Sequence, residues 1–151
     1  MRAPVGEIER LIHSTGFYRN KARNIQGFAR ILIEKYSGVL PQTVAQLTGL
    51  PGIGRKTANV IMGEIYGKAE GIVVDTHVKR ISRLLAFTRS TNPVQIEKDL
   101  MLSVPETYWI DWSLYLIFLG RDRCRARQRF CEDCVLGQIC PSSTAPVKSS
   151  T

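Results

Sequence analysis

Four cysteines toward the C-terminal end of the chain have the spacing of a metal site. Cys124, Cys131, Cys134 and Cys140 are separated by six, two and five residues, and they are the only cysteines among the 151 residues. All four therefore lie within a stretch of 17 residues, short enough to fold around one centre. Four thiolates suit either a zinc ion or an iron–sulfur cluster.

The spacing of these cysteines favours the cluster. Zinc sites made of four cysteines usually present two Cys-X2-Cys pairs, and this chain has one, Cys131 and Cys134. Disulfides are a third alternative, but clustered cysteines inside a cell more often bind metal than pair. We therefore expect a 4Fe-4S cluster, with zinc as the alternative.

A second segment could hold a phosphate. Residues 50–58 read LPGIGRKTA, with Gly52 and Gly54 on either side of Ile53 and with Arg55 directly after them. Two glycines one residue apart allow a tight hairpin, and the helix expected after it would direct backbone N–H groups outward at its start. The alternative is an ordinary helix–helix connection.

The elements that must position these residues all have helical periodicity. We expect Asp75 and Asn92 to cap helices, Pro41 to start one, and Ser37-Gly38 to end one. The β-branched run 72–74 is too short to form a sheet, so the predicted fold is all-α. The expected helices cover about 6–14, 21–36, 41–47, 55–66, 76–87, 93–103 and 106–119.

The charge balance indicates a polyanionic partner. Lysine and arginine outnumber aspartate and glutamate by 21 to 13, which gives a formal charge of +8; a bound cluster with its thiolates would leave about +6. Every second residue from 121 to 129 is arginine, and we expect these side chains to bind phosphates. The alternative is a set of solvated charges that offset the cluster. They are Arg121, Arg123, Arg125, Arg127 and Arg129.

Other classes of protein are disfavoured. The sequence has no run of about 18 apolar residues and no charged-then-apolar leader, so we expect neither membrane insertion nor secretion. An intracellular location follows, in the cytoplasm and nucleoid or in the nucleus of a eukaryote. The small, polar segment 142–151 is expected to be a disordered tail.

Three motifs together resemble endonuclease III, of the helix-hairpin-helix DNA glycosylase superfamily with a 4Fe-4S cluster. They are LPGIGRKTAN at 50–59, VDTHV at 74–78 and the cysteine loop, and they occur in the family's order and spacing. The resemblance covers about 6–141. It implies an all-α fold, a substrate of double-stranded DNA with oxidised pyrimidines or abasic sites, and a combined N-glycosylase and AP-lyase reaction.

The resemblance implies roles for single residues. Lys56 would attack the anomeric carbon and form a Schiff base; the positive end of its helix and partial burial would both disfavour its charged form. Asp75 would stabilise positive charge on the sugar. Phe17 aligns with the family's intercalating wedge. The alternatives are a Lys56 that only contacts phosphate, an Asp75 that only caps, and a Phe17 that packs in the core.

The resemblance also implies a division of the chain and a departure from the family. We expect a partial helical lobe at 1–74, with the helix-hairpin-helix motif at about 43–66, and a second lobe at 75–141 with the cluster loop at 124–140. Roughly the first third of the family's domain has no counterpart, which should expose apolar surface and favour self-association or a missing N-terminal segment. Abasic-site chemistry should then be retained better than base recognition. A monofunctional mismatch glycosylase and a non-catalytic DNA-binding fragment are the alternative functions.

Overall fold

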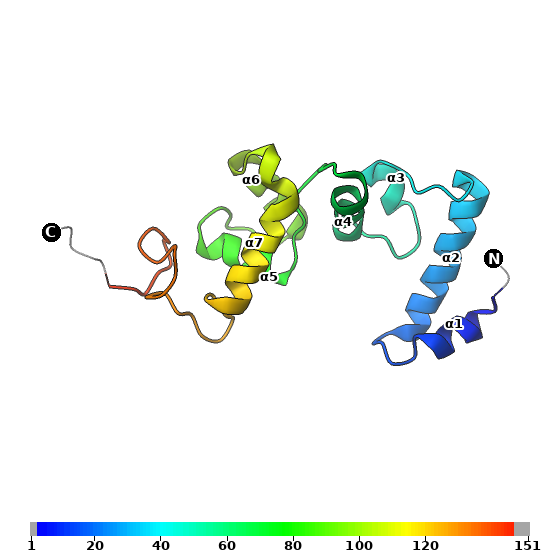
Figure 1. Ribbon diagram of the computed structural model, residues 1–151, viewed down its shortest axis with the longest axis horizontal. Helices are drawn as coiled ribbons and strands as arrows, with labels where there is room; N and C mark the ends of the chain where they lie inside the picture. The colour runs from blue at the N-terminus through cyan, green and yellow to red at the C-terminus, as the bar shows by residue number, and fades with distance from the viewer. Residues whose placement is uncertain (1–2, 147–151) are drawn as a thin grey trace. The chain divides into compact units, whose positions relative to one another are not determined.

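The computed structural model describes residues 3–146, and the elements it contains are helices (Figure 1). Within this range, the extended backbone forms one isolated antiparallel bridge, between Cys124 and Arg129, and no strand. The chain divides into two compact units, Met1–Tyr66 and Gly67–Thr151. The predicted all-α class is therefore confirmed.

The first unit contains four helices, drawn from blue to green in Figure 1. They are α1 (Val5–Leu11), α2 (Tyr18–Tyr36), α3 (Val44–Thr48) and α4 (Arg55–Tyr66). Helix α2 ends as expected at Ser37, which adopts the left-handed conformation, and the N–H of Gly38 donates to the carbonyl of Leu32 at 2.9 Å. The N–H of Ser37 donates to the same carbonyl, so the first two residues after the helix close its last turn.

The core of the first unit holds α3 against α4. Its fully or nearly fully buried members come from both helices and from the turn between them, and Phe28 of α2 packs against them. The hydroxyl of Tyr66 donates to the carbonyl of Leu40 at 2.8 Å, which ties the end of α4 to the segment before α3. The buried members are Val44, Leu47, Leu50, Ala58 and Met62.

The second unit contains α5 (Thr76–Leu84), α6 (Pro93–Ser103), the short 3-10 helix η1 (Glu106–Tyr108) and α7 (Trp109–Asp122). Helices α5 and α7 lie side by side in Figure 1 and cross closely at Gly120. A Cβ built on Gly120 would lie 2.5 Å from Nδ1 of His77 and 2.8 Å from Cδ1 of Ile81, so a larger residue would force these side chains to shift. The buried core is Ile72, Val78, Ile81, Ile96, Leu100, Val104 and Leu116.

The caps of this unit agree with the sequence. Asp75 and Asn92 both cap helices through their side chains, and the 72–74 run has no strand. The compact units divide at Gly67, eight residues before Asp75, because Ile72 is part of the second core. Trp109 and Trp112 pack against that core, whereas Tyr115 and Phe118 are exposed.

Several predicted helix limits are wrong by a few residues. The third helix begins at Val44 and not at Pro41, because the hydroxyl of Thr43 accepts from the N–H of Gln46 at 3.2 Å and caps it there. The first helix ends at Leu11, and the last continues to Asp122. In the segment expected to be disordered, Ser142 ends a turn, 143–146 contain no helix or strand, and 147–151 lie outside the described residues.

Apolar side chains are exposed in both units. The expected exposure of apolar surface is found at Leu11, Ile33 and Ile65 in the first unit and at Phe118 in the second. None of the helices between residues 3 and 146 has the length and apolar character needed to cross a membrane. Self-association through these exposed side chains, or their burial by another segment, stays a prediction.

Candidate functional site: a glycine hairpin and a cysteine loop

The hairpin before α4 has the tight geometry expected of Gly52 and Gly54. The N–H of Ile53 donates to the carbonyl of Leu50 at 3.1 Å, and Gly52 has a φ of 79°, in the left-handed region. A Cβ built on Gly52 would lie 2.9 Å from Cβ of Asn24 on α2. Both backbone conformation and space therefore demand glycine at position 52.

The other residues of the hairpin divide between anchoring and exposure. Leu50 is buried and Ile53 packs against the core of the first unit, whereas Gly52, Gly54 and Arg55 are exposed. The carbonyl of Gly54 accepts from the N–H of Ala58 at 2.9 Å, which begins α4. An exposed turn at the start of a twelve-residue helix is a geometry that can hold an anion.

Lys56 lies in the first turn of α4 and is exposed. The expected partial burial of Lys56 is therefore wrong: α4 turns Ala58 and Met62 toward α3, and the lysine lies outside that buried stripe. Its amine is accessible to a large substrate. The predicted start of the helix at Arg55 is confirmed.

Asp75 is half-buried and caps α5 in the second unit. Its Oδ1 accepts from the N–H of Val78 at 2.8 Å, which satisfies one donor of the first turn. The second carboxylate oxygen is not needed for this bond, so a capping role leaves room for another contact. His77, two residues later, has a buried Nδ1 without a hydrogen-bond partner within residues 3–146.

Phe17 lies between α1 and α2 with 88% of its surface exposed. The alternative that Phe17 packs in the core is therefore wrong. Its φ of 57° places a bulky residue in the left-handed region, which is rare and costs energy. A strained, exposed aromatic side chain on a tight turn has the form that a wedge between DNA bases would need.

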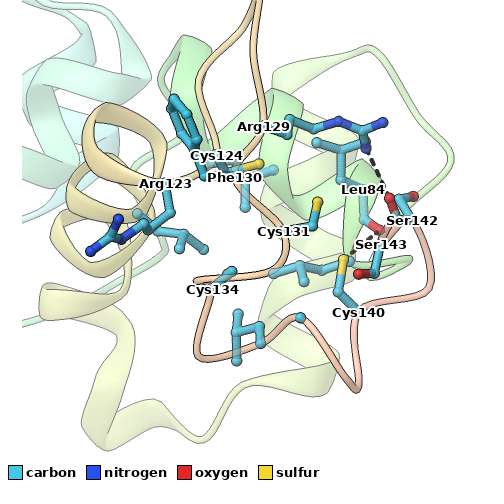
Figure 2. Close-up of a pocket in the computed structure, with 15 residues that line it drawn as sticks. Leu84, Arg123, Cys124, Arg129, Phe130, Cys131, Cys134, Cys140, Ser142 and Ser143 are labelled. Carbon is cyan, nitrogen blue, oxygen red and sulfur yellow. Dashed lines mark hydrogen bonds between the residues drawn. The ribbon is translucent and has the colours of Figure 1, made fainter. Parts of the chain in front are cut away.

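All four cysteines line one pocket of the second unit (Figure 2). They are unpaired, so no disulfide competes for Cys124, Cys131, Cys134 or Cys140. The apolar wall of the pocket comes from α5, α7 and the loop itself, through Ile81, Leu84, Leu85, Leu119, Phe130 and Leu136. A dry pocket that gathers four thiols from one loop fits a thiolate-bound cofactor.

The arrangement of the sulfurs bears on the choice of metal. Among the described residues, no three His, Cys, Asp or Glu side chains come close enough together to hold a single ion. A tetrahedral zinc site needs all four sulfurs about 2.3 Å from one ion, whereas a 4Fe-4S cluster receives each thiolate on a different iron. The four thiols of the pocket are donors that either centre could use.

The environment of the loop favours the thiolate of Cys131. The side chain and backbone of Thr144 form hydrogen bonds that hold the pKa of Cys131 below its usual range, with a smaller contribution from the charge of Arg129. Figure 2 shows Cys140, whose Sγ lies 3.8 Å from the carbonyl oxygen of Leu84 on α5. These contacts fix the loop against the helix.

Gly137 permits the tight path of the loop. Its N–H donates to the carbonyl of Cys134 at 2.8 Å, and a Cβ built on it would collide with the carbonyl oxygen of Cys131. This constraint was not evident from the sequence, because Gly137 lies between two of the cysteines at a position without a recognisable turn motif. Glycine is therefore needed here for the four cysteines to face one pocket.

The arginines expected to bind phosphate are all exposed, but they differ in their contacts. Arg129 donates to the carbonyl of Ser142 at 2.9 Å (Figure 2), and Arg125 lies over the ring of Phe130 with 5.4 Å from its Cζ to the centroid. Arg123 pairs with Asp122. Arg121 and Arg127 extend the same basic segment. The described contacts thus give Arg125 and Arg129 a structural role beside any binding role.

One contact with the cysteines was missed from the sequence. The guanidinium of Arg80, on α5, donates to Sγ of Cys124 at 3.6 Å. The residues are 44 positions apart, and only the packing of α5 on α7 brings them together. Arg80 follows Asp75 by five residues, so one short helix carries both the capping aspartate and this contact.

Comparison with known proteins identifies the family. A family model described as HhH-GPD superfamily base excision DNA repair protein matches residues 1–106. The chain belongs to this superfamily. The HhH-GPD assignment confirms the resemblance on which the roles of the hairpin and cysteine residues were predicted, although those roles themselves stay predictions.

HhH-GPD relatives of this chain carry the name endonuclease III. The protein from Synechocystis sp. is 49% identical over 92% of this chain and 64% of its own length. That from Bacillus subtilis strain 168 is 42% identical over 93% and 64%, and that from Escherichia coli K12 is 38% identical over 88% and 63%. The chain therefore spans about 64% of the length of these first two curated relatives.

Solved structures with a similar fold agree with the family assignment. A trapped covalent intermediate of endonuclease III with DNA matches 93% of this chain and 66% of its own chain, with a TM-score of 0.85 at 42% identity. A non-covalent endonuclease III–DNA complex gives the same score and identity. A thermostable thymine-DNA glycosylase, at 24% identity and a TM-score of 0.82, shares the fold.

Proposed function

We propose that this chain acts in DNA base-excision repair as a bifunctional DNA N-glycosylase and AP lyase. Its substrate would be double-stranded DNA containing oxidised pyrimidines or abasic sites, reached in the cytoplasm and nucleoid or in a nucleus. The observation that carries the proposal is an exposed lysine, Lys56, in the first turn of the helix that follows the glycine hairpin. Membership of the HhH-GPD superfamily and similarity to endonuclease III support it.

The proposed reaction begins with a neutral Lys56 amine. The lone pair of Nζ forms a bond to C1′ of the sugar while the bond from C1′ to the base breaks, and the base leaves with that electron pair and takes up a proton. At an abasic site the leaving group is the C1′ hydroxyl, released as water. Opening of the sugar ring and loss of a proton from nitrogen then give a Schiff base. Removal of a C2′ proton expels the 3′ phosphate and breaks the strand.

Asp75 is proposed to assist this reaction. One carboxylate oxygen is engaged at the N-terminus of α5, and the carboxylate charge would stabilise the positive charge that develops on the sugar. The same residue could accept a proton during base release. Cap and catalyst are compatible roles, because the capping bond uses a single oxygen.

DNA contacts are proposed for both units. Gly52, Ile53, Gly54 and Arg55 would hold a backbone phosphate through the exposed hairpin turn. Phe17 would fill the gap that a flipped nucleotide leaves, since unstacking costs a few kcal/mol. Arg125, Arg127 and Arg129 would add phosphate contacts that depend on salt concentration.

The cofactor is proposed to be a 4Fe-4S cluster held by Cys124, Cys131, Cys134 and Cys140. When bound, it would supply a rigid cross-link for the loop 124–140 and no bond-making step of the base-excision reaction. The cysteines ligate, Thr144 and Arg129 favour the thiolate of Cys131, and Gly137 lets the loop close. Iron and acid-labile sulfide in the purified protein support this proposal; stoichiometric zinc in a colourless protein contradicts it.

Borohydride trapping tests the lysine chemistry. The full chain is incubated with a duplex that contains one abasic site, and reduction of the Schiff base yields a covalent protein–DNA adduct. Lys56→Ala should give no adduct. Lys68→Ala, a matched control at another exposed lysine, should trap as the unmodified chain does.

Two outcomes would overturn the proposal. Equal trapping by Lys56→Ala would move the nucleophile elsewhere. Absence of trapping by a folded, iron-loaded chain that still binds DNA would favour the non-catalytic DNA-binding fragment. A parallel duplex with an oxidised pyrimidine measures base excision, which is expected to be slower than cleavage at the abasic site.

A further inference from the structure

Helix α5 borders a strongly basic groove in the second unit. Seven residues line it: Thr76, Lys79, Arg80, Arg83, Leu84, Thr88 and Arg89. Four of the seven are cationic, two carry hydroxyls, and none is acidic. Neither the glycine hairpin nor the arginine-rich segment 121–129 contributes a residue, so the groove is a separate basic surface.

No carboxylate neutralises the cations of this groove within the part of the chain that the structure describes. Within residues 3–146, none of the four forms an ion pair with an aspartate or glutamate. The carboxylate of Asp99 accepts from the hydroxyl of Thr88, which lines the groove, and from Nε2 of Gln95. Arg80 donates to Sγ of Cys124. The other three cations, Lys79, Arg83 and Arg89, repel one another, which a bound polyanion would relieve.

Lys79 and Arg83 are placed to contact successive anionic groups. They are four residues apart on α5, so their Cα atoms are separated by about 6 Å along the helix axis and share a face. Arg83 and Arg89 are exposed, and Lys79 is half-buried. Such a row matches a linear array of charges better than a single small ion.

The lining also decides between a nucleic acid and a protein partner. Protein–protein interfaces depend on apolar and aromatic anchors in a desolvated centre. The groove offers a single apolar residue, Leu84, and no aromatic ring. Cations and hydroxyls are the groups that contact phosphate oxygens in DNA complexes.

The groove adjoins the cysteine loop. Leu84 lines both the groove and the cysteine pocket, and its carbonyl oxygen lies 3.8 Å from Sγ of Cys140. Arg80, one turn before Leu84 on α5, donates to Sγ of Cys124. A phosphate strand in the groove would therefore lie beside the loop and its arginines, within one compact unit.

We infer that the α5 groove binds the phosphate backbone of duplex DNA through Lys79, Arg83 and Arg89. The inference rests on DNA being the partner in the proposed function and adds a contact surface to it. These three contacts read no sequence; they add affinity that falls with salt, and they lengthen the stretch of duplex that the chain covers.

Salt-dependent binding tests the groove. Affinity of the full, iron-loaded chain for an undamaged duplex is measured by fluorescence anisotropy over a range of salt concentrations. The triple variant Lys79→Gln, Arg83→Gln, Arg89→Gln is compared with a control that also loses three charges, at the exposed residues Arg10, Lys68 and Lys98. The groove variant should lower the slope of log affinity against log salt by about 3, and the control by less than about 1.

Equal slopes in the two triple variants would overturn the inference. If the unmodified chain bound an acidic peptide and the groove variant did not, while both bound DNA with the same slope, the groove would be assigned to a protein partner. If the triple variant unfolds, Lys79→Gln and Arg83→Gln alone should each lower the slope by about 1. Arg80 is left unchanged because it contacts Cys124. Borohydride trapping at saturating DNA should persist in the groove variant, so failure of the groove and failure of the lysine chemistry are distinguishable.

Discussion

The guanidinium of Arg80 donates to Sγ of Cys124 at 3.6 Å. Because Arg80 belongs to α5 and Asp75 caps the same helix, this bond joins the first cysteine of the loop to the helix that begins at the proposed catalytic carboxylate. The close crossing of α5 and α7 at Gly120 brings Arg80 and Cys124 together. The cysteine loop is therefore held by helix packing as well as by its own turns.

Removal of this contact should weaken retention of the metal centre. In Arg80→Met the alkyl part of the side chain is kept, but the charge-assisted hydrogen bond to Cys124 is lost. Outer contacts of this kind typically change metal affinity by about 10–100-fold, so iron should be lost to a chelator about tenfold faster. Loss of visible absorbance with time measures it. Arg83→Met, one helical turn away without a cysteine contact, should match the unmodified chain.

Gly137→Ala should prevent the loop from closing around a metal centre. The added methyl group would collide with the carbonyl oxygen of Cys131 and lie 3.0 Å from that of Cys134, and both are backbone atoms that cannot rotate away. The iron content of purified protein should fall well below that of Gly6→Ala, whose Cβ meets nothing within 4 Å. A fully loaded Gly137→Ala protein would show that the loop has another path.

Local signals predicted most of the fold, because they act over a few residues. The caps at Asp75 and Asn92 depend on a side chain and an N–H two or three residues later, so they were evident from the sequence. Thr43 was overlooked as a cap because Pro41 is also a strong helix-starting signal. Pro41 and Thr43 are helix-starting signals only two residues apart, and in the structure the helix begins after Thr43.

The environment of a side chain was harder to predict than its secondary structure. The exposure of Lys56 and of Phe17 depends on which neighbours pack beside them, and periodicity does not contain this information. The Arg80–Cys124 bond joins residues 44 positions apart, so no local pattern reveals it. The cysteine spacing was informative because all four cysteines lie in one short loop, so their proximity depends on residues close together in the sequence.

Gly52 and Gly54 should respond differently to alanine. Gly52→Ala should reduce the free energy of unfolding by roughly 1–3 kcal/mol, because φ at this position is 79° and Asn24 leaves no room. Gly54→Ala should leave stability nearly unchanged, since its Cβ meets nothing within 4 Å and its φ is not positive. Denaturant titration measures both.

Gly52→Ala and Gly54→Ala also distinguish an effect on stability from an effect on DNA binding. If the hairpin holds a phosphate, the methyl group of Gly54→Ala would keep the DNA backbone away, and affinity for duplex DNA should fall by about tenfold although the chain is fully folded. Unchanged affinity in Gly54→Ala would remove the hairpin from the DNA-binding surface.

Phe17→Asn should weaken DNA binding without reducing stability. The ring is 88% exposed, so little burial is lost, and asparagine tolerates the left-handed backbone better; the free energy of unfolding should rise by up to about 1 kcal/mol. Affinity for a duplex with an abasic site should fall because the gap is no longer filled. Leu102→Asn, at an 89% exposed position on α6, serves as the control and should bind normally.

Thr88→Val should change how stability depends on pH. Hydrogen bonds from the buried Thr88 and from Gln95 hold the pKa of Asp99 below its ordinary value. A carboxyl with a lowered pKa in the folded state contributes stability that is complete above the unfolded value of about 3.9 and disappears as pH falls through the folded value. Thr88→Val should therefore unfold at a lower temperature than the unmodified chain near pH 7, and the gap should narrow below pH of about 4. Thermal unfolding at several pH values measures it, and a gap that is constant with pH would show that Thr88 acts through packing and not through Asp99.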